Sequence, residues 1–433
     1  MPEMTSPSSR RFAPSRLLIW FGFALVLALA PLLLSSSLAT NILSQIGCMI
    51  IICLSYNMLL GQGGMLSFGH AVYTGLGGFA AVIVVSTVSS RNIPMPVVLV
   101  PILGGVVGAL VAVPLGYIST KKSGTTFAMI SLGIGELVAA VAMMLPGLFG
   151  GDGGISINRT YGERFLGVTF GPQIQVYYLI AVYCFVCTAL MYAFTGTPLG
   201  RMLNAVRDNP ERVAFIGFDT QLVRWIAFII SGFFAGIGGA LVAINFEIFN
   251  AADALSGLKS GAYLLFTFLG GATVFFGPII GAILMVLASV LLSEFTAAWL
   301  LYLGVIFLVM VMYAPGGVAS LIMMNVRVSR FGKLNRFWGL YGGLLVTGAI
   351  LLLGVAALIE MVYHRQLNAS MGPDAKFIFT ALDTSSAAVW AGAIAVTLVG
   401  AGLLEFVRRR FARAWGQAQE EIEAEIKRRE QAA

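Results

Sequence analysis

Long apolar runs, interrupted by short polar segments, form the main pattern along this chain. Leu17 to Ser90 is a stretch of 74 residues without Asp, Glu, Lys or Arg, and Ser260 to Ser293 is another of 34. A helix needs about 20 apolar residues to cross a bilayer. The pattern predicts twelve membrane-spanning helices, near residues 17–34, 41–60, 71–89, 95–118, 125–148, 174–194, 225–246, 261–276, 278–294, 297–314, 338–359 and 387–406.

The composition excludes several classes of protein. Hydrophobic residues make up 58% of the chain and charged residues 10%, whereas a soluble domain carries about 25% charged residues. A water-soluble fold of this composition could not cover its own surface. A soluble enzyme, a secreted module and a nucleic-acid-binding protein are therefore excluded as descriptions of the whole chain. The net charge of +7 has another explanation, because Lys and Arg accumulate in the cytoplasmic loops of membrane proteins.

Basic residues predict the direction of the spans. With twelve spans and a cytoplasmic N-terminus, 20 of the 26 Lys and Arg residues fall on the cytoplasmic side. This asymmetry favours cytoplasmic N- and C-termini. The first span could instead be a cleaved signal peptide, since it follows a basic start; we favour an uncleaved helix.

The chain lacks the motifs of a nucleotide hydrolase or a metal site. No GxxxxGK[ST] or HExxH sequence occurs, and the four cysteines (Cys48, Cys53, Cys184 and Cys187) lie within apolar runs, where we expect buried apolar thiols. Glu136 is the clear ionisable residue deep within a predicted span. Ion-coupled carriers commonly use several buried carboxylates or histidines. We therefore expect no cofactor in this chain and an energy source outside it.

The loop from Thr195 to Arg224 is the longest predicted cytoplasmic loop among the first ten spans. It contains a short helix candidate, with Asp208 or Asn209 as the N-cap and Pro210 in the first turn. Val213, Ile216 and Phe218 would form an apolar side, and Arg207, Glu211 and Arg212 a charged side. Such a helix could dock on an ATPase partner, or the segment could be an ordinary solvated loop.

The sequence of this loop resembles the coupling loop of LivM-like permeases, the membrane subunits of branched-chain amino acid ABC importers. Other segments resemble the family in the same order: GQGGMLSFGHAVYTGLGGF at 61–79, TTFAMISLGIGEL at 125–137, GGDGGI at 150–155, AFIISGFFAGIGGAL at 227–241 and YAPGGVASL at 313–321. A glycine-rich segment at 270–282 resembles it imperfectly, because Thr273 and Val274 replace an expected Gly-Thr. The resemblance covers roughly residues 41–323. The positions that match the family's loop are Gly200, Arg201, Ala205, Arg207, Asn209, Ala214 and Gly217. The residues that we predict to couple the permease to an ATPase are Gly200, Arg201, Ala205, Arg207, Asp208, Asn209, Glu211, Arg212 and Gly217.

The resemblance implies an all-α polytopic membrane protein, with a permease core of about ten spans of the type II ABC importer kind and two extra C-terminal transmembrane helices. It implies a second, homologous LivH-like permease as partner, two ATP-binding subunits that use the ATP, a periplasmic substrate-binding protein and a bacterial inner membrane, with lipid around the chain and no nucleic acid. Branched-chain amino acids are the implied substrate. Urea, amides and small organic acids are alternatives, and an ion-coupled secondary carrier or a membrane scaffold remain alternatives of another class.

Four consecutive residues are candidates for the translocation path or its gate: Ser67, Phe68, Gly69 and His70. They end a glycine-rich interruption of an apolar stretch, and unwound backbone at membrane depth is tolerated where it is buried or lines a path. The alternative is a short turn between two spans.

Glu136 is the fifth candidate for the translocation path. An ionised carboxylate at its depth would be costly, so it should be protonated, paired or wet. It could contact an ammonium group of the substrate. A hydrogen bond to the backbone of a neighbouring helix is the reading we slightly favour.

Three GxxxG motifs, at 104–108, 232–236 and 277–281, predict close helix packing. Mixed charges in the predicted outer loops at 149–173 and 247–260 could dock a binding protein or be simply solvated.

From the predicted spans and the extent of the resemblance we expect a cytoplasmic tail at 1–16, a permease core at 17–323 with its coupling loop at 195–224, a two-helix extension at 324–406 and a charged, helical cytoplasmic tail at 407–433.

Overall fold

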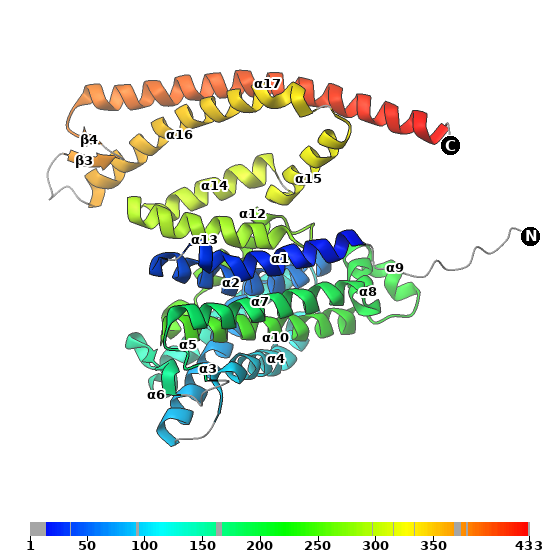
Figure 1. Ribbon diagram of the computed structural model, residues 1–433, viewed down its shortest axis with the longest axis vertical. Coiled ribbons are helices and arrows are strands. Elements are labelled where there is room, and N and C mark those ends of the chain that lie inside the picture. Colours follow the sequence, from blue (N-terminus) through cyan, green and yellow to red (C-terminus); the bar gives the residue numbers. More distant parts are fainter. Residues whose placement is uncertain are drawn as a thin grey trace, which may run out of the picture. The chain divides into compact units, whose positions relative to one another are not determined.

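The computed structural model describes most of the chain (Figure 1). The described residues are 14–34, 36–91, 95–161, 167–296, 298–314, 316–332, 334–367, 374–377 and 380–431. Most of the predicted N-terminal tail (residues 1–13) and residues 162–166 of the first predicted outer loop lie outside them. The chain divides into two compact units, Met1–Leu287 and Ala288–Ala433.

The first unit is almost entirely helical. Its elements, with the unit boundary falling inside the last helix, are α1 (Pro14–Leu33), α2 (Ser37–Asn57), the π-helical turn η1 (Met58–Gln62), α3 (His70–Arg91), η2 (Val97–Leu99), α4 (Val100–Ser119), α5 (Thr125–Met144), α6 (Pro146–Phe149), η3 (Gly151–Gly153), β1 (Ile155–Ser156), η4 (Arg159–Tyr161), α7 (Gln173–Gly196), α8 (Pro198–Asp208), α9 (Pro210–Phe215), α10 (Thr220–Phe246), β2 (Ile248–Phe249), α11 (Ala251–Ala254), α12 (Gly257–Gly270) and α13 (Gly277–Phe295).

The second unit contains fewer and longer helices. Its elements are α14 (Trp299–Tyr313), α15 (Gly317–Arg330), η5 (Leu334–Phe337), α16 (Trp338–Leu367), β3 (Asp374–Phe377), β4 (Thr380–Asp383) and α17 (Ala387–Gln431).

Nine helices in the described residues are long and apolar enough to cross a membrane, or ten if the bent pair α14 and α15 forms one span. The nine coincide with nine of the twelve predicted spans. The other three predictions, at 17–34, 261–276 and 297–314, fall on shorter helices. The apolar part of α1 is Leu18–Leu33, α12 has 14 residues, and α14 has 15 residues before a 46° bend. The prediction of an all-α, multi-span membrane protein is confirmed.

Helix α10 forms the centre of the first unit. It packs against α2, α3 and α4, and 72% of its most apolar 18-residue stretch is buried. Its first turn is capped by the Asp219 carboxylate, which accepts hydrogen bonds from the backbone N–H groups of Gln221 and Leu222. The helix ends where Glu247 adopts a left-handed conformation with φ of 58°. These ends place the predicted coupling loop before α10 and a short segment of the predicted outer side after it.

Close backbone approach explains the first two GxxxG motifs. A Cβ atom added at Gly236 would lie 2.3 Å from the carbonyl oxygen of Gly104, and one at Gly108 would lie 2.4 Å from that of Gly232. The two motifs therefore pack against each other across α4 and α10, as their spacing predicted. The third motif packs within the α12–α13 hairpin, where a Cβ at Gly281 would lie 2.0 Å from the Phe266 carbonyl oxygen.

Two short antiparallel ladders interrupt the helical architecture. β1 pairs with β2, with Ile155 opposite Phe249, and β3 pairs with β4, with Asp374 opposite Asp383. The first ladder joins the segment before α7 to the residues that follow α10. The second lies in the connection between α16 and α17.

The second unit is held together by the α16–α17 pair. At one end of this pair Phe337, Phe411 and Trp415 form an aromatic cluster around the buried Val328 and Ile422. The charged segment after residue 406 continues α17 without a break. The predicted final span and the predicted tail helix are therefore parts of one helix, and the aromatic residues of the tail pack against the region around η5.

Candidate functional site

The chain is interrupted between α2 and α3, where the sequence predicted the path or gate. After the π-helical turn η1, residues 64–67 have no regular structure and residues 68 and 69 form a turn, so that α3 begins at His70. We call residues 61–70 the break segment. Gly64 has φ of +64°, a conformation that favours glycine.

The break segment folds back along α2. The Ser55 Oγ and His70 Nε2 atoms are hydrogen bonded at 2.9 Å, and the Tyr56 hydroxyl donates to the Ser67 carbonyl oxygen at 2.8 Å. Ser55 lies seven residues before the last residue of η1, which corresponds to about 10 Å of helix. Helix α3 therefore starts well inside the length of the preceding span, so the break segment is more than a turn at its end.

His70 occupies a buried, aromatic environment. Its side chain is fully buried, and the rings of Tyr56 and Tyr73 lie 5.0 and 6.2 Å away, measured between ring centroids. Its Nδ1 atom and the Ser67 hydroxyl oxygen have no hydrogen-bond partner in the described part of the chain. Buried polar atoms without a partner are costly, so neither atom stabilises the fold as it stands.

Two helices hold the break segment on its other side. The Phe68 backbone N–H donates to Ser131 Oγ of α5 at 3.0 Å, and the Ala71 N–H donates to Ser260 Oγ of α12 at 3.0 Å. A Cβ atom at Gly69 would lie 2.4 Å from the Ser131 carbonyl oxygen. Glycine at 69 therefore lets α5 approach the backbone directly.

Glu136 lies on a different face of α5. It is five residues after Ser131, a rotation of about 140° around the helix, and its side chain is exposed. Leu132, Gly133 and Leu137 are also exposed, so this face of α5 is uncovered in the single chain. A Cβ atom added to Gly257, at the start of α12, would lie 2.9 Å from Glu136 Oε1. The five path candidates thus divide into four in the break segment and one on the uncovered face.

The coupling loop contains two short helices instead of one. The unpredicted helix α8 is capped by Thr197, whose hydroxyl accepts a hydrogen bond from the Gly200 N–H at 3.2 Å. In α9 the Asn209 side chain accepts from the Arg212 N–H at 2.9 Å, and Gly217 follows the helix with φ of +92°. The predicted N-cap at Asn209 is confirmed, and so is the glycine that ends the helix.

The apolar side of α9 is divided between the protein and the solvent. Val213 is buried, whereas Phe215, Ile216 and Phe218 are 91%, 68% and 50% exposed. We call these three residues, two of which are aromatic, the exposed aromatic patch. The structure also places the residues assigned to coupling: Gly200 is buried against the Phe194 carbonyl, and the remaining ones are exposed on α8, α9 and the residues beside them, namely Arg201, Ala205, Arg207, Asp208, Asn209, Glu211, Arg212 and Gly217.

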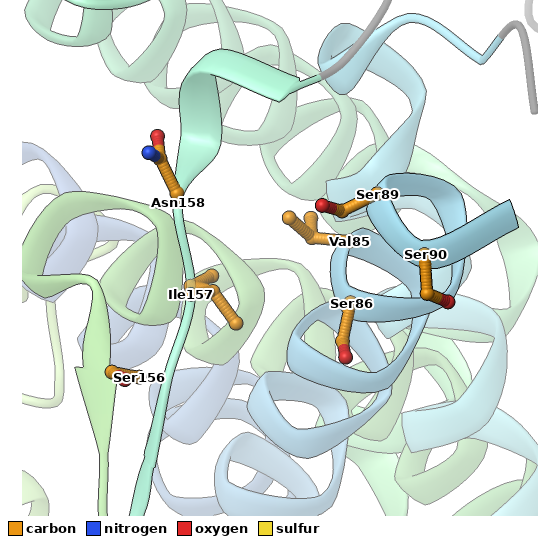
Figure 2. Close-up of a pocket in the computed structure, with 7 residues that line it drawn as sticks. All are labelled: Val85, Ser86, Ser89, Ser90, Ser156, Ile157 and Asn158. Atoms are coloured by element: carbon orange, nitrogen blue, oxygen red, sulfur yellow. The ribbon is translucent and has the colours of Figure 1, made fainter. Parts of the chain in front are cut away.

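The opposite end of α3 from His70 borders a hollow of about 390 Å³. In Figure 2, Val85, Ser86 and Ser89 of α3 lie on one side of it, and the extended segment with Ile157 and Asn158 lies on the other. The predicted path residues do not line this hollow. Its lining is rich in hydroxyl groups and suits contact with a polar surface.

Arg159 fastens the predicted outer segment next to this hollow. Its guanidinium donates to the carbonyl oxygens of Phe170 and Gly171 and forms an ion pair with Glu247, with Nε and Oε1 3.7 Å apart. Lys259 and Asp253 are similarly paired at 3.1 Å. Some of the charged residues that could dock a binding protein thus form ion pairs within the predicted outer loops.

Sequence reasoning did not select several residues that hold the site together. Ser55 and Tyr56 lie in an apolar run, and Ser131 and Ser260 lie within or beside predicted spans. A lone hydroxyl in such a run is compatible with many roles. The signal that could have selected Ser131 is its position within the segment that resembles the LivM-like permeases.

Comparisons with known proteins agree on one family. A profile of the family described as "Branched-chain amino acid transport system / permease component" matches residues 38–314. The LivM permease protein of Salmonella typhimurium is 25% identical over 325 residues, covering 70% of this chain and 75% of that protein. The probable LivM protein of Methanocaldococcus jannaschii is 26% identical over 334 residues, covering 66% and 94%.

A sugar permease is also similar. The galactose/methyl galactoside import permease protein MglC of Salmonella typhimurium is 26% identical over 282 residues, covering 60% of this chain and 80% of that protein. No solved structure matches the chain.

Proposed function

The chain belongs to the family of permease components of branched-chain amino acid transport systems, and from this premise we propose that it is a translocating subunit of an ATP-driven importer in the bacterial inner membrane. The observation that carries the proposal is the exposed aromatic patch of the coupling loop. Phe215 is 91% exposed although it lies beside a buried valine in a short, well-capped helix. An aromatic residue held in that position suits a partner surface.

The partner that we propose for this patch is an ATP-binding subunit. No P-loop motif occurs in residues 1–433, and we therefore propose a separate ATP-binding subunit as the source of nucleotide hydrolysis. The charge distribution favours a cytoplasmic position for the coupling loop. Glu211 and Arg212 of the same short helix are also exposed, so charged residues accompany the apolar ones, as they do at the edge of many protein interfaces.

A second permease would cover the uncovered face of α5. A carboxylate that faced lipid would be expensive, yet Glu136 is exposed among apolar residues in a helix suited to span a membrane. A water-filled path between two permeases would keep Glu136 hydrated and cover Leu132 and Leu137. We therefore propose that this face lines the path and that the break segment, joined to α5 through Ser131, gates it.

The outer end of the path would receive solute from a periplasmic binding protein. With cytoplasmic termini, the hollow beside Ser86 and Asn158 lies on the periplasmic side. On that side Arg159 donates to the carbonyl oxygens of Phe170 and Gly171, which holds these residues in place. A fixed, polar surface suits a transient docking partner.

Branched-chain amino acids are the substrates that we propose first. The similarity to the LivM proteins named above supports them. The similarity to the galactoside permease makes other small polar solutes the alternative substrates. An ion-coupled carrier is the weaker alternative. Such carriers commonly use several buried carboxylates or histidines, whereas Glu136 is the one clear carboxylate deep in the predicted spans.

Reconstitution tests the proposal. The chain would be purified with its sister permease and ATPase subunits and placed in liposomes with the cognate binding protein. ATP-dependent accumulation of radiolabelled leucine is the expected result. Accumulation by the chain alone under a sodium or proton gradient would contradict it, as would uptake that needs neither ATP nor the binding protein.

A further inference from the structure

One face of α8 lies directly on the break segment. Leu203 and Arg207 are four residues apart and therefore share a face of the helix. A Cβ atom at Gly63 would lie 3.3 Å from Leu203 Cδ1, and Leu203 is fully buried. The coupling loop is thus anchored to the interrupted span by an apolar contact.

Arg207 adds a polar contact at the neighbouring position. Its guanidinium NH1 group donates a hydrogen bond to the Gly61 carbonyl oxygen, near the end of the π-helical turn. Its aliphatic stem lies over Gly64, where a Cβ atom would come within 2.8 Å of Arg207 Cγ. The absence of a side chain at 64 therefore allows the arginine to reach Gly61.

The same guanidinium is held by the next residue. Arg207 NH2 lies 2.9 Å from Asp208 Oδ1, and Arg207 Nε donates to that oxygen at 3.0 Å. A planar guanidinium bound on one side by a carboxylate and on the other by a carbonyl has little rotational freedom. A displacement of α8 would therefore be passed to Gly61 and would not be absorbed by the side chain.

The break segment transmits such a displacement further into the membrane. Tyr56 is bonded to the Ser67 carbonyl, and the Phe68 N–H is bonded to Ser131 of α5. On its other side Gly61 is tightly packed, since a Cβ there would lie 2.1 Å from the Ala272 carbonyl oxygen. Contacts of the coupling loop at Gly61 and Gly64, and contacts of α2 and α5 at Ser67 and Phe68, thus lie within one short segment of backbone.

We propose that Arg207 is a positioning residue that ties the coupling loop to the break segment, so that movement of α8 with the ATPase subunits opens or closes the path at Ser67–His70. The inference rests on the proposed function, because it needs an ATPase partner on the coupling loop. This role differs from that of a basic residue that only orients the chain in the membrane. It requires a hydrogen-bond donor directed at Gly61 and the absence of a side chain at Gly64.

The test compares Arg207→Gln, Arg207→Lys and Gly64→Ala in the full reconstituted complex. Leucine uptake and ATP hydrolysis are measured together. We expect Arg207→Gln to lower uptake per ATP hydrolysed at least tenfold while the ATPase subunits remain bound. Arg207→Lys keeps the charge and stem and should lose less. Gly64→Ala leaves the arginine in place but obstructs it, and should match Arg207→Gln.

The matched control is Lys122→Gln, which removes an exposed positive charge from the loop between α4 and α5. Unchanged uptake per ATP is expected there. An unchanged ratio in Arg207→Gln would overturn the inference. Loss of bound ATPase subunits in that variant would also overturn it, because Arg207 would then serve docking and not transmission.

A second readout does not depend on the substrate. Phe68→Cys is labelled by a membrane-impermeant maleimide with and without ATP and vanadate, against a background of four native cysteines that are buried. Nucleotide should change the labelling rate in the otherwise native complex, and Arg207→Gln should remove this change. A complex that responds to nucleotide but does not take up leucine would contradict the proposed substrate and leave the role of Arg207 supported; the same nucleotide response with Arg207→Gln would overturn that role.

Discussion

Phe68 and Ser131 are hydrogen bonded through the backbone N–H of one and the hydroxyl of the other, at 3.0 Å. They are 63 residues apart in the chain, and the bond joins an interrupted span to the middle of another span. Serine at 131 thus supplies a partner for a backbone N–H that the end of regular structure leaves free. The relationship connects the break segment to α5.

Replacing Phe215 by Asp should prevent ATPase docking without unfolding the permease. Because the side chain is 91% exposed, little folding free energy depends on it. A buried aromatic anchor in an interface is commonly worth 2 kcal/mol or more, roughly a 30-fold loss of affinity. Co-purification of the ATPase subunits measures the effect.

Leu258→Asp provides the matched control for the exposed aromatic patch. Leu258 is 85% exposed and lies at the start of α12, in a predicted outer region. It should leave the ATPase subunits bound. Equal recovery of these subunits with Phe215→Asp and the native chain would show that the exposed aromatic patch is not the docking surface.

His70→Ala should abolish uptake and the stimulation of ATP hydrolysis by the loaded binding protein. The substitution removes the bond to Ser55 and leaves a cavity among three tyrosine rings. Loss of the hydrogen bond alone should lower the free energy of unfolding by about 1 kcal/mol, and the cavity should lower it further. His70→Gln, which can still bond Ser55, should retain more activity. Normal uptake with His70→Ala would remove the gate assignment.

Glu136→Gln tests whether the uncovered face of α5 lines the path. Because the side chain is exposed in the single chain, thermal stability of the isolated permease should change little. If its charge contacts the ammonium group of the substrate, uptake should fall about tenfold or more, an effect of about 1.4 kcal/mol. Transport at the native rate would favour the hydrogen-bonding alternative and contradict the charge hypothesis.

Gly236→Ala should destabilise the permease, because the new methyl group would lie 2.3 Å from the Gly104 carbonyl oxygen and 3.1 Å from Gly105 Cα. Overpacking of this kind costs about 1–3 kcal/mol, and the thermal midpoint in detergent should fall. Gly22→Ala, where the added atom meets nothing within 4 Å, should be neutral or slightly stabilising. A midpoint with Gly236→Ala equal to that of the native chain would contradict the packing of α4 on α10.

Ending the chain after residue 323 tests the predicted boundary between core and extension. The family profile ends at residue 314, so we expect assembly and transport to survive without α16 and α17. Because these helices pack on each other, for example through Tyr341 of α16 and Phe411 of α17, they should be removed together. Loss of ATPase binding in the shortened chain would show that the extension belongs to the working transporter.

Much of the architecture follows from local patterns. Nine of twelve predicted spans match long helices because a continuous apolar run is sufficient for a bilayer span. At one of the other three predictions backbone geometry interrupts the run, because α12 ends after 14 residues at Gly271, which has φ of +114°. Hydropathy does not detect such an interruption, because glycine belongs equally well inside or between spans.

The sequence by itself determined that this protein is a multi-span permease, that its coupling loop caps a helix at Asn209 and that residues 67–70 end an interruption. These are local features, set by apolar run length, capping side chains and glycine. Only the tertiary structure decided that the break segment folds back onto Ser55, that Arg207 reaches Gly61 and that Glu136 faces away from His70. Those contacts join residues 15 to 146 positions apart or depend on rotation about a helix axis, and neither property is encoded in a local pattern.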